Sequence, residues 1–148
     1  MRAVVALGSN AGPRADCLRR AIDALSGLPG TRFTGASSVI ETDPVDVPPE
    51  FEALRFLNQV AVFETELDPL EFSRRMHMIE EDLGRVRNAV NGPRTIDIDL
   101  IDFDGRTLRS PYLTLPHPRA CEREFVLRPL RELGLSICQQ RCQQVVKL

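Results

Sequence analysis

The chain has 148 residues and a formal net charge of −2, with 43% hydrophobic and 27% charged residues. These values are typical of a globular protein with one core, so we expect a single domain over residues 1–148. No apolar run approaches the roughly 20 residues of a membrane-spanning helix, and the first apolar run reaches Gly8 too early for a signal peptide. We therefore expect a cytoplasmic protein with no membrane partner.

Basic residues are distributed unevenly. Residues 1–84 contain 8 Arg and 14 acidic residues, whereas residues 85–131 contain 9 Arg and 6 acidic residues. The excess favours a small anionic ligand such as a nucleotide, and it is too scattered for the broad basic face that nucleic acid requires. Lys147 is the only lysine, which excludes a phosphate-loop or Schiff-base lysine in the folded part. The four cysteines, taken with His117, match zinc spacings poorly, and we expect reduced thiols.

Hydrophobic patterning in the first half predicts strands alternating with one helix. In chain order we expect a strand at Arg2–Leu7, a helix at Ala15–Leu25, a strand at Thr31–Ile40, a long loop at Glu41–Arg55 and a strand at Phe56–Glu64.

A second helix begins after Asp68. Asp68 suits the N-cap, Pro69 the first helical position and Glu71 the third. The apolar stripe at 3,4 spacing consists of Phe72, Met76, Ile79 and Leu83, and Gly84 is expected to end the helix.

The segment Ile96-Asp97-Ile98-Asp99-Leu100 alternates apolar and acidic residues. In a strand the apolar residues line one face, and Asp97 and Asp99 share the other, with Cα atoms roughly 6.5–7 Å apart. Two carboxylates at this spacing can converge on Mg²⁺, which phosphate oxygens then help to coordinate. An ordinary strand with a solvated polar face gives the same alternation.

Arginines beside this strand favour the functional interpretation. Gly84-Arg85-Val86-Arg87 and Gly92-Pro93-Arg94 precede it, and arginine pairs with phosphate in bidentate fashion. The pair Asp97 and Asp99 and these arginines together predict a site for a metal-bound polyphosphate.

The remaining elements complete the predicted fold. Asp104-Gly105 predicts a hairpin turn, after which Arg106–Leu108 is expected to pair back antiparallel. A short turn and the segment Phe125–Leu130 follow. The βαββαβ order predicts a ferredoxin-like α+β fold with an antiparallel sheet covered by helices.

Five motifs in this chain, taken in their order and spacing, resemble the 6-hydroxymethyl-7,8-dihydropterin pyrophosphokinase family over residues of about 3 to 131. They are Ala6–Asn10, Phe56–Asn58, Gly84–Arg87, Gly92–Asp99 and Leu115–Leu127. The resemblance implies transfer of the β,γ-pyrophosphoryl group of ATP, the co-substrate, to the hydroxymethyl oxygen of 6-hydroxymethyl-7,8-dihydropterin. AMP is released, and the reaction belongs to folate biosynthesis. We expect a monomer with no nucleic-acid partner.

The resemblance also implies individual roles. The residues implied in catalysis are Arg85, Arg94, Asp97 and Asp99, of which the two aspartates are the implied ligands of two Mg²⁺ ions. The residues implied in ATP binding are Arg87, Thr114, His117 and Arg123. The residues implied in pterin binding are Thr42, Pro44, Val45, Phe56, Asn58 and Phe125.

Structural alternatives accompany these roles. The arginines can pair with nearby acids, His117 can be a turn residue bonded to backbone, and the two phenylalanines can be core residues. The loop Asn88–Asn91 lacks the aromatic and extra basic residues of many family members, and His77 stands where many have Gln. Glu80 has two interpretations, as a contributor to the site or, more simply, as a charged residue on the helix surface. The segment 135–148 resembles the family least, as a divergent helix or tail.

Two other functions remain open. A metal-dependent nucleotidyl or phosphoryl transferase acting on another hydroxyl keeps the aspartates but leaves Phe56, Asn58 and Phe125 unexplained. A non-enzymatic ferredoxin-like module that senses a nucleotide leaves the aspartates idle.

Overall fold

A computed structural model describes residues 1–43, 49, 55–83 and 96–135 of the chain. Its central feature is an antiparallel sheet with strand order β2-β4-β1-β5, to which β3 adds by pairing with β4. The strands are β1 (Arg2–Ser9), β2 (Thr31–Ala36), β3 (Ile40–Thr42), β4 (Phe56–Thr65) and β5 (Asp97–Phe103).

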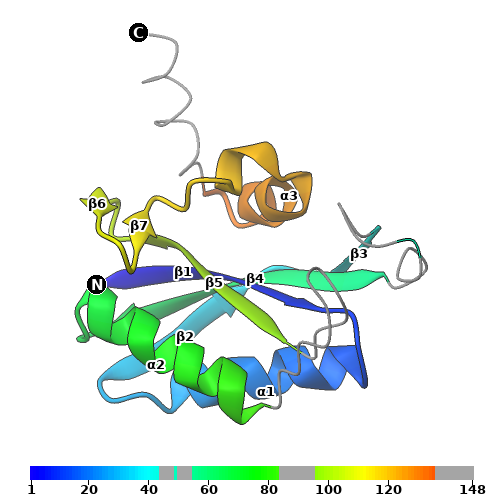
Figure 1. The fold of residues 1–148 in the computed structure, drawn as a ribbon, viewed down its shortest axis with the longest axis horizontal. Helices are drawn as coiled ribbons and strands as arrows, with labels where there is room; N and C mark the ends of the chain where they lie inside the picture. Colours follow the sequence, from blue (N-terminus) through cyan, green and yellow to red (C-terminus); the bar gives the residue numbers. More distant parts are fainter. Residues whose placement is uncertain (44–48, 50–54, 84–95, 136–148) are drawn as a thin grey trace, which may run out of the picture.

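Helices cover both faces of this sheet (Figure 1). Helices α1 (Arg14–Ser26) and α2 (Pro69–Asp82) lie on one face, and α3 (Glu124–Glu132) lies on the other. The order β1-α1-β2-β4-α2-β5 confirms the predicted ferredoxin-like core. No helix in the described part of the chain is long and apolar enough to cross a membrane.

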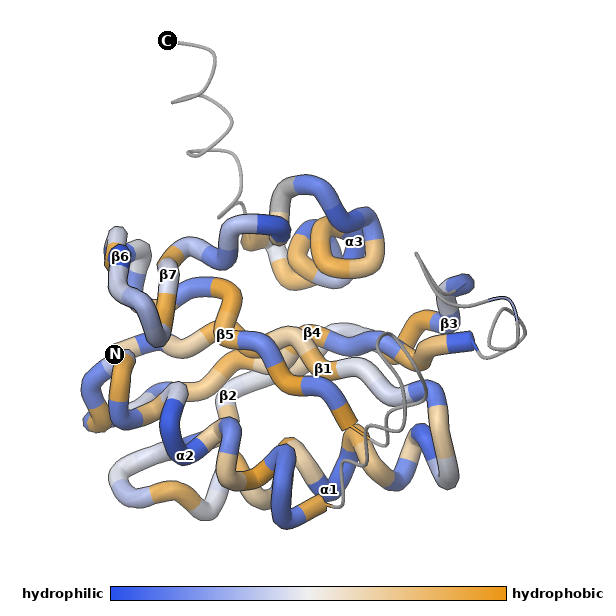
Figure 2. The backbone as a smooth tube through the Cα atoms, in the orientation of Figure 1, coloured by the Kyte–Doolittle hydropathy of each residue, from blue (hydrophilic) through white to orange (hydrophobic). Residues whose placement is uncertain are grey.

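Two hydrophobic clusters hold these layers together. The larger one fills the space between the sheet, α1 and α2, and its largest buried side chains include Leu7, Phe63, Phe72, Phe103 and Ile98. The smaller one lies under α3 and contains Val4, Val60, Ile101, Ala120, Val126 and Leu130. Since successive residues of a strand face opposite sides, strands β1, β4 and β5 each contribute to both clusters. Figure 2 shows the resulting alternation of hydrophilic and hydrophobic residues along β5.

The N-terminus of α2 forms as predicted. The Asp68 side chain accepts a hydrogen bond from the Glu71 amide at 2.9 Å, and Pro69 occupies the first turn. The helix ends at Asp82 with Leu83 at the C-cap, and Gly84 lies outside the described residues.

The single strand predicted at Thr31–Ile40 is wrong, because the structure has β2 and β3 with a break between them. The Ser37 hydroxyl accepts the Val60 amide, and the Ser38 amide and hydroxyl both donate to Glu132 of α3. Side-chain hydrogen bonds of this kind compete with the strand ladder and end it. The start of the predicted loop, Glu41–Thr42, belongs to β3.

The turn at Asp104-Gly105 is confirmed, since both residues have positive φ values of 57° and 69°, as a type I′ turn requires. The expected pairing of Arg106–Leu108 with the preceding strand is wrong. Instead β6 (Leu108–Arg109) pairs with β7 (Thr114–Leu115) in a separate hairpin. The outer edge of β5 is engaged elsewhere, because the carbonyl of Ile101 accepts the His117 amide at 2.9 Å.

Candidate active site

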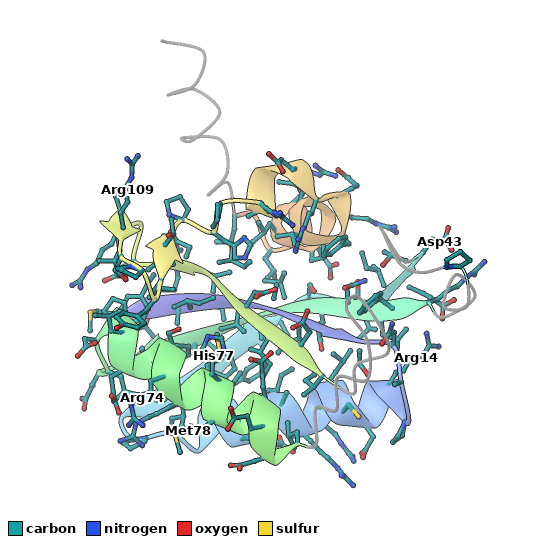
Figure 3. The ribbon with its side chains drawn as sticks, viewed as in Figure 1. Arg14, Asp43, Arg74, His77, Met78 and Arg109 are labelled. Atoms are coloured by element: carbon teal, nitrogen blue, oxygen red, sulfur yellow. The ribbon has the colours of Figure 1, made fainter. Side chains whose placement is uncertain are left out.

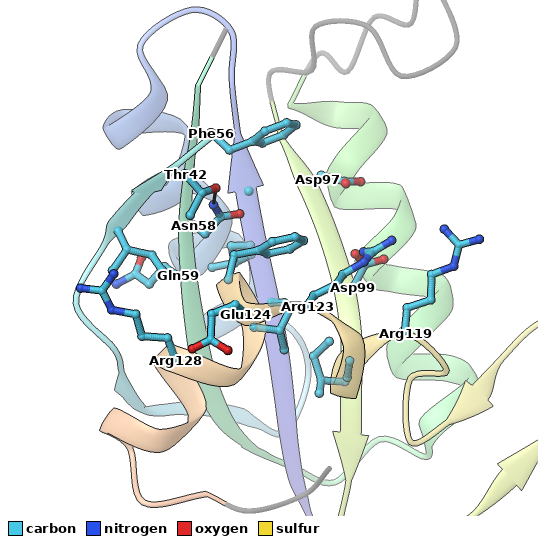
Figure 4. A pocket seen from close by; sticks show the side chains of 18 of the residues that line it. Thr42, Phe56, Asn58, Gln59, Asp97, Asp99, Arg119, Arg123, Glu124 and Arg128 are labelled. Carbon is cyan, nitrogen blue, oxygen red and sulfur yellow. Dashed lines mark hydrogen bonds between the residues drawn. The ribbon is translucent and has the colours of Figure 1, made fainter. Parts of the chain in front are cut away.

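A pocket of about 520 Å³ opens on the face of the sheet that α3 covers. Strands β1, β3, β4 and β5 form its floor and one wall. The 3-10 turn η2 (Ala120–Glu122) and α3 form the other wall. Figure 4 shows Thr42, Phe56 and Asn58 at one end of the pocket and Asp97, Asp99 and Arg119 at the other.

Strand register places these two groups in the same rows of the sheet. Gly8 of β1 pairs with Asn58 of β4 on one side and with Asp97 of β5 on the other. In the next row Ala6 lies opposite Asp99. Directly paired residues face the same side, and strands β4 and β5 lie about 10 Å apart across β1. Small residues on β1 therefore leave open floor between the amide and the carboxylates.

The aspartates face the pocket from β5, as the sequence alternation predicts. Both line the pocket, whereas Ile98 and Leu100 belong to the core on the opposite face. Burial, the charge of Asp97 and the charge of Glu80 raise the pKa of Asp99 to about 6, against smaller opposing effects of Arg123 and His77. The carboxylates of Asp97, Asp99 and Glu80 thus influence one another, and a cation bound here would reduce their repulsion.

A histidine and arginines line the wall opposite the aspartates. His117 Nε2 lies 4.0 Å from Asp99 Oδ1, while its Nδ1 accepts the Arg119 amide at 3.2 Å. This second bond fixes the tautomer that carries its proton on Nε2, toward the carboxylate. His117 thus accepts a backbone amide, as a turn residue does, and also lines the pocket. Arg123 lies over the Phe125 ring, 5.5 Å from its centroid.

The other end of the pocket joins an amide to aromatic rings. Asn58 is 6% exposed and its Nδ2 donates to Thr42 Oγ1 at 2.6 Å, so its amide is held in a fixed orientation. A Cβ at Gly8 would lie 3.3 Å from Asn58 Oδ1 and 3.6 Å from the Phe56 ring. Gly8 therefore leaves room beside both groups. Phe125 of α3 lines the same pocket and also packs against the smaller core.

Eight of the predicted site residues line this pocket: Thr42, Phe56, Asn58, Asp97, Asp99, His117, Arg123 and Phe125. Thr114 lies on β7, outside the pocket lining. Five others lie outside the described residues: Pro44, Val45, Arg85, Arg87 and Arg94. Their roles stay sequence predictions.

Sequence reasoning missed two arginines of the site and misjudged the exposure of one glutamate. Arg119 and Arg128 line the pocket, and no motif singled them out. Glu80, interpreted from sequence as an exposed helix residue, is 2% exposed and contacts β5. Its position four residues after Met76 and eight after Phe72 places it beside the apolar stripe of α2, which is a signal available in the sequence.

Comparison with known proteins identifies the family of this chain. The family model for 7,8-dihydro-6-hydroxymethylpterin-pyrophosphokinase matches residues 4–134. A Bacillus subtilis protein named 2-amino-4-hydroxy-6-hydroxymethyldihydropteridine pyrophosphokinase is 40% identical over 145 residues, which cover 98% of this chain and 80% of the relative. The Pseudomonas aeruginosa protein of the same name is 39% identical over 136 residues, which cover 90% and 80% of the two chains.

Solved structures share the fold. Wild-type Plasmodium falciparum HPPK-DHPS, crystallised with pteroate, superposes with a TM-score of 0.67 at 17% identity. The match covers 88% of this chain and 38% of that longer one.

The layered sheet and its pocket define a ferredoxin-like α+β protein with an acidic pair facing an aromatic and amide end. The chain belongs to the 7,8-dihydro-6-hydroxymethylpterin-pyrophosphokinase family, whose members are ATP-dependent diphosphotransferases.

Proposed function

We propose that the protein transfers the pyrophosphoryl group of ATP to the hydroxymethyl oxygen of 6-hydroxymethyl-7,8-dihydropterin, with Mg²⁺ as the required cation. The observation that carries this proposal is that one pocket holds two different groups. The carboxylates of Asp97 and Asp99 lie at one end, and the Asn58 amide beside the Phe56 ring lies at the other. Family membership supplies the reaction, and the pocket supplies a place for both substrates.

The donor set fits a hard divalent cation. Asp97 and Asp99 offer carboxylate oxygens on one face of β5, and burial together with the charges of Asp97 and Glu80 raises the pKa of Asp99. No group of three or more His, Cys, Asp or Glu side chains suited to a metal occurs among the described residues, so phosphate oxygens are expected to complete the coordination. We propose that these two aspartates hold two Mg²⁺ ions, which when bound neutralise charge on the transferring phosphates.

His117 and Arg123 are suited to bind the phosphates of ATP. The Nε2 proton of His117 and the guanidinium of Arg123 face the carboxylate end of the pocket, where the triphosphate would lie. Preorganised donors of this kind stabilise charge that develops on phosphoryl oxygens. Arg85 and Arg94 are proposed to add to this stabilisation, on the sequence motifs alone.

The amide end is suited to a flat, polar heterocycle. Asn58 can both donate and accept hydrogen bonds, and the rings of Phe56 and Phe125 offer apolar faces for stacking. A pterin bound here would direct its hydroxymethyl group across the Gly8 floor toward the aspartates. The protein then acts mainly by holding the two reactants together.

The reaction balances without a further co-reactant. The hydroxymethyl oxygen forms a bond to the β-phosphorus of ATP, the bond from that phosphorus to the α,β-bridging oxygen breaks, and AMP leaves with the bridging oxygen. The hydroxyl proton passes to solvent. We propose that one chain is sufficient for activity, since the described residues of one chain line both ends of the pocket.

The test is product analysis after mixing protein, Mg²⁺, ATP and the hydroxymethyl-dihydropterin. The proposal predicts AMP and pterin pyrophosphate in equal amounts, and neither product without pterin. ADP in place of AMP, or nucleotide cleavage that ignores the pterin, contradicts it.

A further inference from the structure

Glu80 is a carboxylate on α2 that lies almost wholly inside the protein. Its side chain is 2% exposed, at the contact between α2 and β5. A buried carboxylate is costly unless polar groups compensate it. Its partners therefore indicate what it does.

Both oxygens of Glu80 are engaged. Oε2 accepts the backbone amide of Ile98 at 2.8 Å, and Oε1 contacts Nδ1 of His77 at 2.8 Å. His77 lies one helical turn before Glu80, on the flank of α2 near β5, away from Arg74 and Met78 (Figure 3). The contact at Oε1 orients the carboxylate so that Oε2 meets the strand.

Ile98 lies between Asp97 and Asp99. Because β5 is the last strand in the sheet order, its outer edge has no neighbouring strand among the described residues. Glu80 supplies an acceptor at this edge for the amide of the peptide that joins Asp97 to Ile98. The orientation of a peptide plane sets the direction of the side chains on either side of it. Glu80 is thus placed to act on the acidic pair through the backbone.

We propose that Glu80 is a positioning residue that ties α2 to the Ile98 amide and thereby holds Asp97 and Asp99 in the orientation that binds Mg²⁺. This inference rests on the proposed function of the aspartates. A packing role alone needs no carboxylate at this position, since an apolar side chain of similar size is less costly to bury.

Two substitutions of Glu80 separate the effect of its side-chain length from the effect of its negative charge. Glu80→Gln keeps the side-chain length and an oxygen that can accept the Ile98 amide, but it removes the charge. Glu80→Asp keeps the charge but is one methylene too short to span the 2.8 Å bond from the same backbone. Glu81→Gln is the matched control, because Glu81 is the next residue of α2 and is exposed.

Two measurements test each variant. The first is hydrogen exchange of the Ile98 amide in the metal-free protein, which reads the hydrogen bond directly. The second is the Mg²⁺ concentration that gives half-maximal AMP formation. In Glu80→Asp we expect the exchange rate of the Ile98 amide and the half-saturating Mg²⁺ concentration each to rise about tenfold or more. In Glu80→Gln both values should stay within about threefold of wild type. Glu81→Gln should match wild type in both.

Several results overturn the proposal. Wild-type Mg²⁺ dependence in Glu80→Asp shows that the bond to Ile98 does not position the aspartates. A loss in Glu80→Gln that is absent from Glu80→Asp shows that the charge of Glu80 matters and the length of its side chain does not. A fall in melting temperature in both variants with unchanged Mg²⁺ dependence shows a purely structural role.

Failure of the proposed function is distinguishable from failure of this inference. If the wild-type protein forms no AMP, the Ile98 exchange and a Mn²⁺ titration in the presence of α,β-methylene-ATP, read by electron paramagnetic resonance, still compare the variants. If wild type forms AMP and Glu80→Asp behaves identically, the function stands and the positioning role of Glu80 is refuted.

Discussion

Replacement of Asp99 by Asn is expected to raise the stability of the metal-free protein while removing its activity. Burial and the charges of Asp97 and Glu80 raise the pKa of Asp99 from 3.8 to about 6. A rise of this size corresponds to about 3 kcal/mol of unfavourable free energy in the charged form. The side chain is 39% exposed toward the pocket, and solvent screening reduces the expected effect to about 1–2 kcal/mol.

The sign follows from the direction of the pKa change. Because the pKa is higher in the folded protein than in the unfolded one, the folded protein retains the proton longer as the pH rises. The carboxylate therefore destabilises the fold increasingly between about pH 4 and pH 6, and fully above that range. At pH 8 in EDTA, Asp99→Asn should melt about 3–6 °C above wild type, and the difference should be small near pH 4.

Thermal unfolding by circular dichroism at both pH values, combined with AMP formation, checks this prediction. Turnover by Asp99→Asn should fall on the order of 10³-fold, because the cation loses a charged ligand. Glu81→Gln removes one exposed negative charge and should leave both measurements near wild type. A lower melting temperature than wild type at pH 8, or turnover above a tenth of wild type, refutes the reasoning.

Three further predictions concern the amide end and α2. Gly8→Ala should raise KM for the pterin with little change in KM for ATP, because the added Cβ would crowd Asn58 and Phe56. Steady-state kinetics measures both values, and an equal rise in both would contradict this prediction. Asn58→Ala should weaken pterin binding roughly 10–100-fold, as calorimetry can measure, and unchanged affinity would remove Asn58 from the pterin site. Asp68→Ala should lower the unfolding free energy by about 1 kcal/mol in urea denaturation, since α2 loses its N-cap, and an unchanged midpoint would argue against that cap.

The parts of the fold that depend on local sequence could be predicted. The alternation around Asp97 and Asp99 indicated which residues share a face, and the structure puts both acids in the pocket with Ile98 in the core behind them. The N-cap at Asp68 was equally predictable, because its partner, the Glu71 amide, lies three residues away. Such features need only the period of the element and the chemistry of neighbouring residues.

Features that depend on distant contacts could not be predicted. The break between β2 and β3 arises from Ser37, which bonds to Val60, and from Ser38, which bonds to Glu132 of α3. These partners are 23 and 94 residues away in sequence. The pairing of β6 with β7 likewise depends on what occupies the edge of β5, where His117 bonds to the Ile101 carbonyl.

The pocket could not be predicted from local sequence patterns, because it depends on how β1 pairs with β4 and β5. Local pattern indicates that Asn58 and Asp97 each face one side of a strand, but it does not say that they face the same side of one sheet. Their shared partner, Gly8, makes them members of one row. The family motif around Gly8 thereby has a physical reason, since a side chain there would fill the floor between them.

A crystal structure with Mg²⁺, α,β-methylene-ATP and 6-hydroxymethyl-7,8-dihydropterin tests the central claim most directly. The account predicts metal bound by Asp97 and Asp99, and the pterin bound to Asn58 with its hydroxymethyl oxygen facing the β-phosphorus. Metal bound away from both aspartates, or a pterin outside this pocket, would contradict it.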